Sequence, residues 1–185
     1  MTIQPIETRY AGCRFRSRLE ARWAVFFDQL KIQWFYEPQG WLTLGAPYLP
    51  DFYLPHQNLW FEVKGRPSQI GDSGRRYESL ALGTRRRVIL AVGDIPRPDE
   101  DIATCEGVNA NHYMEVFYPE GWDNYQAWCR CDMCGATDVQ FMGWNGRNCK
   151  CHPSDRGCGA GERHPDLLAA YEAARSARFE HGERP

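Results

Sequence analysis

Three charged side chains follow one another in a pattern that suits metal-assisted hydrolysis. Asp51 ends the segment YLPD, and Glu62 and Lys64 follow within LWFEVKG at 59–65. Carboxylate oxygens are the ligands that hard cations such as Mg²⁺ prefer, and a bound cation stabilises the extra charge of a phosphodiester under attack. A lysine can orient or deprotonate the attacking water, which a guanidinium cannot. We therefore expect Asp51 and Glu62 to hold Mg²⁺ or Mn²⁺ and Lys64 to handle the water.

A strand pair must present these residues for that chemistry to work. Residues two apart in a strand point to the same face, so Glu62 and Lys64 emerge together while their apolar neighbours pack into a core. The loop PHQN at 55–58 favours turn geometry. The hairpin that it predicts places Glu62 opposite Asp51.

The segment RFRSRLEARWAVFFDQL at 14–30 has the periodicity of an amphipathic helix over 17–30, with Glu20 at the margin of its apolar stripe. The sequence therefore predicts an α/β fold that begins with this helix. The elements expected after it are strands at 32–37, 41–44, 51–54 and 59–64, a helix at about 73–83, and strands at 87–92 and 112–118.

In its acid, acid and lysine residues, its opening helix and its order of elements, the chain resembles the PD-(D/E)XK nuclease superfamily over roughly residues 9–93. The resemblance implies a restriction-endonuclease-like mixed sheet flanked by helices. It also implies that Glu20 is a further catalytic metal ligand and that the backbone carbonyl of Val63 joins the Mg²⁺ shell. The implied activity is metal-dependent endonucleolytic hydrolysis of DNA, in phage DNA processing, resolvase-like recombination or defence.

Other interpretations of the same residues stay open. Asp51, Glu62 and Lys64 could be surface charges with an ordinary cross-strand ion pair, and Glu20 could belong to a solvated ion-pair network on an arginine-rich helix. At the level of function, the alternatives are a catalytically silent nuclease-fold protein that binds DNA or acts as a scaffold in a complex and, among enzymes, an RNase.

The formal net charge is only −2, but the charges are unevenly placed. Residues 9–31 hold six basic and two acidic side chains, residues 64–87 hold seven and two, and residues 94–123 hold one and eight. The basic segments flank the expected metal site, as a phosphate-binding groove requires. The expected partner is nucleic acid, with DNA preferred, bound by one chain, a homodimer or a larger nucleoprotein complex. The arginines expected to bind it are Arg14, Arg16, Arg18, Arg66, Arg75 and Arg76.

Six of the eight cysteines lie between residues 129 and 158. Cys131 and Cys134, followed by glycine, have the spacing of a zinc knuckle, in which a tight turn lets two thiolates bind one ion. One structural Zn²⁺ is favoured over disulfides, which need an oxidising compartment. The preferred second pair of zinc ligands is Cys149 and Cys151, with Cys158, His152 and Cys129 as alternates.

The chain is long enough for one core with a small appendage. The expected division is a nuclease core at 1–125, a zinc ribbon at 126–164, and a C-terminal helix and tail at 165–185. The aromatic and basic residues of the ribbon either contact DNA or dock the ribbon on the core, with docking preferred. These residues are Trp128, Phe141, Trp144, Arg147 and Lys150.

The sequence also indicates the setting of the protein. No segment approaches the roughly 20 apolar residues that cross a bilayer, and the first residues lack the pattern of a secretory leader. We therefore expect no membrane partner and a cytoplasmic location, in a bacterial or phage-infected cell.

Overall fold

The structure, a computed structural model, describes residues 6–70, 74–97, 112–123, 126–141, 151 and 160–179. These residues form a mixed α/β fold. The helices are α1 (Arg18–Gln29), α2 (Gly74–Thr84), α3 (Pro165–Ser176) and the short 3-10 helix η1 (Pro67–Gln69). The longer strands are β7 (Leu59–Lys64), β8 (Arg87–Gly93), β9 (His112–Tyr118), β11 (Gln126–Cys131) and β12 (Thr137–Phe141). The shorter strands are β1 (Thr8–Tyr10), β2 (Cys13–Phe15), β3 (Phe35–Tyr36), β4 (Trp41–Thr43), β5 (Ala46–Tyr48), β6 (Phe52–Leu54), β10 (Gly121–Asp123) and β13 (Ala160–Gly161).

A six-stranded mixed sheet forms the centre of the fold, in the order β10-β9-β8-β7-β6-β3. The pair β7 and β8 is parallel, and the other pairs are antiparallel. A parallel pair needs a crossover connection, and α2 lies in the chain between these two strands. The two strands that carry the candidate site, β6 and β7, therefore lie inside the sheet.

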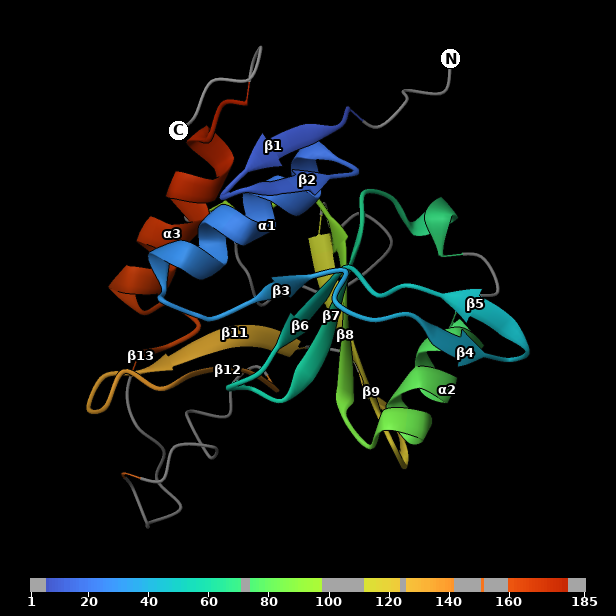
Figure 1. Ribbon diagram of the computed structural model, residues 1–185. Helices are drawn as coiled ribbons and strands as arrows, with labels where there is room; N and C mark the ends of the chain where they lie inside the picture. The colour runs from blue at the N-terminus through green and yellow to red at the C-terminus, as the bar shows by residue number, and fades with distance from the viewer. Residues whose placement is uncertain are drawn as a thin grey trace.

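Helices cover both faces of this sheet (Figure 1). Strand β7 shows how the faces are divided, because successive side chains point to opposite sides. Phe61 and Val63 belong to the buried cluster that contains α1 and α3, whereas Trp60 belongs to the cluster that contains α2. Glu62 and Lys64 share the face of Trp60, as the alternation predicts. The candidate site thus opens on the α2 side.

The helix predicted at 17–30 is confirmed as α1, which begins at Arg18 after its N-cap residue Ser17, although the β1–β2 hairpin precedes it in the chain. Its apolar stripe packs on the sheet: Trp23 and Phe27 contact Phe61 with ring centroids 4.8 and 5.2 Å apart. Such aromatic pairs add about 0.5–1.5 kcal/mol each beyond the area that they bury. Helix α1 therefore fixes the back of the strand that carries Glu62. In the described residues, no helix is both long and apolar enough to cross a membrane.

The predicted strand at 41–44 forms but does not join the central sheet. It is β4, which pairs with β5 in a separate two-stranded hairpin. Strand β5 was not among the elements predicted from the sequence. Leu44 and Gly45, at φ of 50° and 78°, turn the chain back at once. Two successive residues with positive φ produce the tight hairpin turn that matches strand twist. The hairpin lies beside α2 (Figure 1).

Strand β11 and helix α3, both beyond residue 125, pack on the main core. Trp128 of β11 is fully buried, with its ring 5.7 Å from Phe26 and 6.1 Å from Phe61. Tyr171 of α3 stacks on Phe26 at 4.7 Å. Of the two roles considered for the ribbon aromatics, docking therefore holds for Trp128. The side chain of Phe141, together with Trp144, Arg147 and Lys150, lies outside the described residues.

Candidate functional site

Asp51 and Glu62 face each other where β6 and β7 pair. Phe52 pairs with Phe61 in the antiparallel register, so Asp51, the residue before β6, lies opposite Glu62. The backbone N–H of Asp51 donates to Glu62 Oε2 over 3.2 Å. Only 1% of Asp51 and 2% of Glu62 are exposed. The hairpin thus places two acidic side chains next to each other inside the protein, instead of on a solvated surface.

Each of these carboxylates is held by one backbone N–H and one cationic side chain. Asp51 Oδ2 accepts a hydrogen bond from Val63 N–H at 2.8 Å, and Oδ1 accepts one from Arg16 Nη2 at 2.5 Å. Glu62 Oε2 accepts the Asp51 N–H, and Oε1 accepts from Lys64 Nζ. The backbone contacts fix the orientation of both carboxylates. The remaining two oxygens accept from the cationic side chains of Arg16 and Lys64.

Arg16 connects this pair with the loop before α1. Its side chain is 55% exposed, yet it reaches an aspartate that is 2% exposed. Its Nε also lies 2.7 Å from Glu37 Oε1. The backbone N–H of Glu37 donates to the Asp51 carbonyl oxygen at 2.8 Å. Glu37 has a φ of 45°, a conformation that costs a non-glycine residue roughly 1–2 kcal/mol. This strained residue places a further carboxylate beside Arg16.

Glu20 caps the start of α1. Its Oε1 accepts from Ser17 Oγ at 2.8 Å, and its backbone N–H donates to the same hydroxyl at 3.2 Å. The second bond satisfies the backbone N–H of Glu20, one of the donors that the start of a helix leaves without a partner in the helix. Its Oε2 accepts from Tyr36 OH at 2.7 Å and from Arg16 N–H at 3.1 Å. Both oxygens of Glu20 therefore have partners within the protein, which gives this residue a structural role that the sequence did not reveal.

Negative charge accumulates at the site. Burial raises the pKa of Asp51 well above its ordinary value, and the charges of Glu62 and Glu20 raise it further. Lys64 and the Val63 N–H act in the opposite direction without cancelling these effects. The site therefore favours the uptake of positive charge, whether as a proton or as a cation.

Two tyrosines line the same region and were not singled out from the sequence. Burial and the negative charge of Glu62 raise the pKa of Tyr48 far above its ordinary value. Burial and the hydrogen bond to Glu20 do the same for Tyr36. Both phenols therefore stay neutral at physiological pH. No local sequence motif identifies either tyrosine as a site residue, because the residues that surround it in the fold come from distant segments of the chain.

The arginines predicted to bind nucleic acid do not all reach the site. Arg16 contacts Asp51, whereas Arg14 is bonded to Glu7 at 3.0 Å. Arg76 lies over the Tyr48 ring at 5.4 Å, which places it beside the site. Arg18 begins α1, Arg66 follows β7 and is exposed, and Arg75 is exposed near the start of α2.

Three cysteines form a second group of ligand-type side chains. The sulfur atoms of Cys131, Cys134 and Cys151 all lie within 4.8 Å of one another, with 3.5 Å between those of Cys131 and Cys151. Zinc bound tetrahedrally at Zn–S distances near 2.3 Å separates its sulfur ligands by about 3.8 Å. The N–H groups of Met133 and Cys134 donate to Cys131 Sγ, and Gly135 turns the chain at a φ of 69°. These three residues could hold a metal such as zinc.

The other residues considered as zinc ligands have different outcomes. Cys129 is buried, and its thiol lies 3.7 Å from the carbonyl oxygen of Ala127, outside the three-cysteine group. Cys149, His152 and Cys158 lie outside the described residues. In the part of the chain that is described, these three cysteines are the only group of three or more His, Cys, Asp or Glu side chains with ligand atoms this close together. Glu20, Asp51 and Glu62 therefore do not form an equally tight group.

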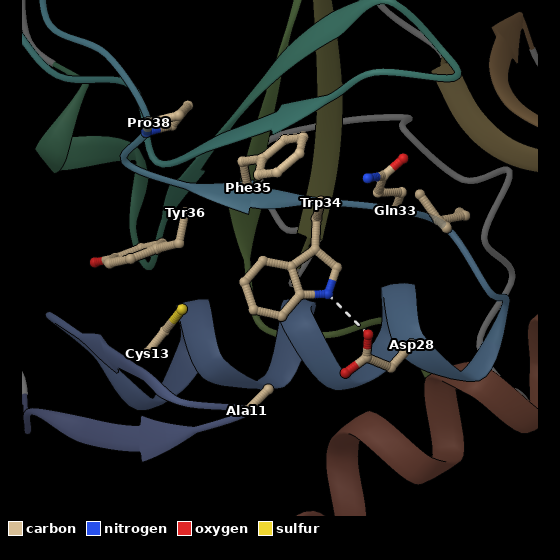
Figure 2. Close-up of a pocket in the computed structure, with 9 residues that line it drawn as sticks. Ala11, Cys13, Asp28, Gln33, Trp34, Phe35, Tyr36 and Pro38 are labelled. Carbon is tan, nitrogen blue, oxygen red and sulfur yellow. Dashed lines mark hydrogen bonds between the residues drawn. The ribbon is translucent and has the colours of Figure 1, made fainter.

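A separate cavity of about 530 Å³ lies between the β1–β2 hairpin, the end of α1 and the segment that leads into β3 (Figure 2). Trp34 Nε1 donates to one Asp28 oxygen at 2.8 Å, and Tyr10 OH donates to the other at 2.7 Å. The polar groups of this wall thus bind one another. Tyr36 lines the cavity and also bonds to Glu20, so the cavity borders the acidic site.

Comparison of the chain with protein families, with curated proteins and with solved structures found no match.

Proposed function

We propose that the protein is a metal-dependent endonuclease of the PD-(D/E)XK type that hydrolyses phosphodiester bonds of DNA. The observation that carries this proposal is the buried pair of Asp51 and Glu62, with Lys64 bonded to Glu62 from the same strand. In an ordinary surface ion pair both charges stay in contact with solvent. Here two carboxylates are buried next to each other, which is costly unless a cation compensates for it.

The donor set fits a hard divalent cation. Asp51 and Glu62 offer carboxylate oxygens, the ligands of Mg²⁺ and Mn²⁺. Burial is the main cause that raises the pKa of Asp51, and the neighbouring charges of Glu62 and Glu20 raise it further, so a cation at the pair would interact favourably with both carboxylates. When bound there, Mg²⁺ or Mn²⁺ would stabilise the charge of the phosphate under attack. Glu20 is proposed to assist from the capping position, and the Val63 carbonyl is proposed as a further ligand by family resemblance.

The side chains of the protein supply the remaining chemistry. Lys64 is 24% exposed and links the buried Glu62 with solvent, so its amine can orient a water at the phosphate. Arg16 and Arg76 lie beside the acidic pair and can bind phosphate oxygens. Pre-positioning of the water and of the phosphate is itself a large part of the catalysis of such reactions.

The cysteine group is proposed to hold a structural Zn²⁺. Cys131, Cys134 and Cys151 supply three thiolates, and a closed structural site needs a fourth ligand. We propose that it comes from Cys149, with Cys158 and His152 as the alternatives. Such an ion would fix the β11–β12 turn and, through it, the position of Trp128 in the core.

Cleavage of a substrate panel tests the proposed activity. The panel contains supercoiled plasmid, linear duplex, single strand, four-way junction and RNA, each with Mg²⁺, Mn²⁺ or chelator. We expect metal-dependent cutting of at least one DNA substrate by the wild type and by Lys31→Ala, whose lysine is exposed beyond α1, but not by Lys64→Ala. Cutting of RNA alone would make the protein an RNase, and inactivity on the whole panel would favour the DNA-binding or scaffold alternative.

A further inference from the structure

The two cations at the acidic pair are attached to the protein in different ways. Lys64 extends from β7, the strand that also carries Glu62, and is 24% exposed. Arg16 extends from the loop before α1 and is 55% exposed. Its guanidinium binds Asp51 Oδ1, the oxygen that is not held by the backbone. Arg16 thus lies between solvent and the one exchangeable oxygen of Asp51.

We propose that the guanidinium of Arg16 is a displaceable counter-ion of Asp51. A divalent cation takes its place at Asp51, and the released guanidinium then binds a phosphate of the substrate. This inference rests on the proposed nuclease function, because it assigns Asp51 as a cation ligand. The sequence predicts Arg16 only as one of several arginines that bind nucleic acid. The inference gives it a specific role, in which it couples cation binding to substrate binding.

The backbone contacts of Arg16 allow this exchange without unfolding the loop. Its N–H is held by Glu20 Oε2 at 3.1 Å and by Tyr36 OH at 3.0 Å, so release of the guanidinium moves only the side chain. Glu37 Oε1, 2.7 Å from Arg16 Nε, provides a second anchor for the same group. A guanidinium stays charged at all relevant pH values and matches the two oxygens of a phosphate.

The exchange predicts opposite effects on two ligands. Without Arg16, the buried Asp51 carboxylate loses a competing positive charge, so a divalent cation binds it more tightly. The same change removes a phosphate-binding group, so DNA binds the cation-loaded protein more weakly. Coupling of two ligands through one group typically amounts to about 5- to 150-fold.

Calorimetric titration of the full chain with Mn²⁺ tests the first effect. Asp51→Asn identifies which binding event belongs to the acidic pair. We expect Arg16→Gln to raise Mn²⁺ affinity at that site at least about fivefold. The matched control is Arg14→Gln. Arg14 lies two residues before Arg16 and is paired with Glu7, so this variant removes the same charge without touching Asp51. Equal affinities in Arg16→Gln and Arg14→Gln would overturn the inference while leaving the nuclease proposal intact.

Fluorescence anisotropy of labelled DNA tests the second effect. Ca²⁺ is used to load the site without turnover. In Ca²⁺, Arg16→Gln should lose at least about fivefold more DNA affinity than Arg14→Gln. In chelator, the two variants should bind DNA with the same affinity. A loss that is the same with and without Ca²⁺ would show a simple phosphate contact and overturn the coupling. Absence of any Asp51-dependent cation site in the wild type would overturn the proposed function as well.

Discussion

The acidic pair and the cysteine group are both sets of ligand-type side chains, but the protein holds them differently. Asp51 and Glu62 lie in a paired hairpin of the central sheet, with backbone N–H donors and two cations of the chain itself. Cys131 ends β11, Cys134 lies in the turn that follows, and Cys151 comes about twenty residues later in the chain. We infer that the sheet forms the acidic site on its own, whereas the proposed zinc would tie together the distant segments that carry the cysteines.

The two sites should therefore respond in opposite ways to the loss of one ligand. Removal of an acidic ligand should abolish chemistry and leave the fold intact, because the sheet does not depend on the cation. Removal of a thiolate should weaken the fold, because structural zinc supplies folding free energy directly. Four substitutions sharpen or break this contrast.

The largest expected effect is the loss of activity in Asp51→Asn. The amide keeps the shape of the side chain but is a much poorer cation ligand, so cleavage should fall by at least about 10³-fold, the scale seen when a catalytic residue is removed. Single-turnover cleavage with saturating Mg²⁺ measures the loss. Activity within tenfold of the wild type would remove Asp51 from the proposed site.

The same variant should become relatively more stable as the pH rises. The pKa of Asp51 is raised in the folded protein, so its favourable contribution is complete below the unfolded pKa and is lost as pH rises through the folded pKa. The Tm of metal-free Asp51→Asn, relative to that of the wild type, should therefore increase as the pH rises above about 4, the ordinary pKa of an aspartate. A difference in Tm that does not change with pH would contradict the raised pKa of Asp51 in the folded protein.

A loss of stability of several kcal/mol is expected for Cys134→Ser in the zinc-loaded protein. Thermal unfolding and zinc content should fall together, because the remaining thiolates cannot complete a closed site. The control is Cys13→Ser, whose thiol lines the separate cavity of Figure 2. Full zinc content in Cys134→Ser would exclude this cysteine as a ligand.

Trp128→Ala should cost about 3–5 kcal/mol, the range for deleting a large buried aromatic side chain. Trp128 is fully buried between α1 and β7, whereas Trp122 of β10 is 58% exposed and makes a suitable control. Denaturant unfolding of Trp128→Ala and Trp122→Ala measures the difference. Similar costs would show that the segment beyond residue 125 folds independently of the main core.

The smallest effect is expected for Glu20→Gln. The glutamine oxygen can still accept from Ser17, but the amide nitrogen cannot accept from Tyr36 or from the Arg16 N–H, so a modest fall in Tm is expected. Loss of the charge near Asp51 should lower cleavage by about 10–100-fold, as for groups that act next to metal ligands. An unchanged cleavage rate would confine Glu20 to its capping role.

Local patterns in the sequence predict α1, the β6–β7 hairpin and β9. The apolar stripe of α1 gives that helix within one residue at each end. The PHQN loop predicts the β6–β7 hairpin, and Asn58 adopts the positive φ, 51°, that asparagine tolerates in turns. The strand at 112–118 is also confirmed, as β9. Periodicity and turn chemistry are local properties, and they suffice for these elements.

The partners of the site could not be predicted in the same way. Arg16 meets Asp51 across 35 residues of sequence, and nothing in the spacing of the six basic residues at 9–31 distinguishes it from the others. The hydrogen bond from Tyr36 to Glu20 likewise depends on how α1 lies on the sheet. The β4–β5 hairpin was missed because its signal, a single Leu-Gly turn, is weak. Long-range packing decides which charges meet.

Anomalous X-ray scattering from crystals loaded with Mn²⁺ tests the central claim most directly, since it locates both metals in one experiment. The account predicts a manganese peak between the carboxylates of Asp51 and Glu62, with the guanidinium of Arg16 moved away from Asp51. It also predicts a zinc peak at the cysteine group. A map with no manganese at Asp51 and Glu62 under saturating Mn²⁺ would contradict the proposed catalytic site, whatever the zinc peak shows.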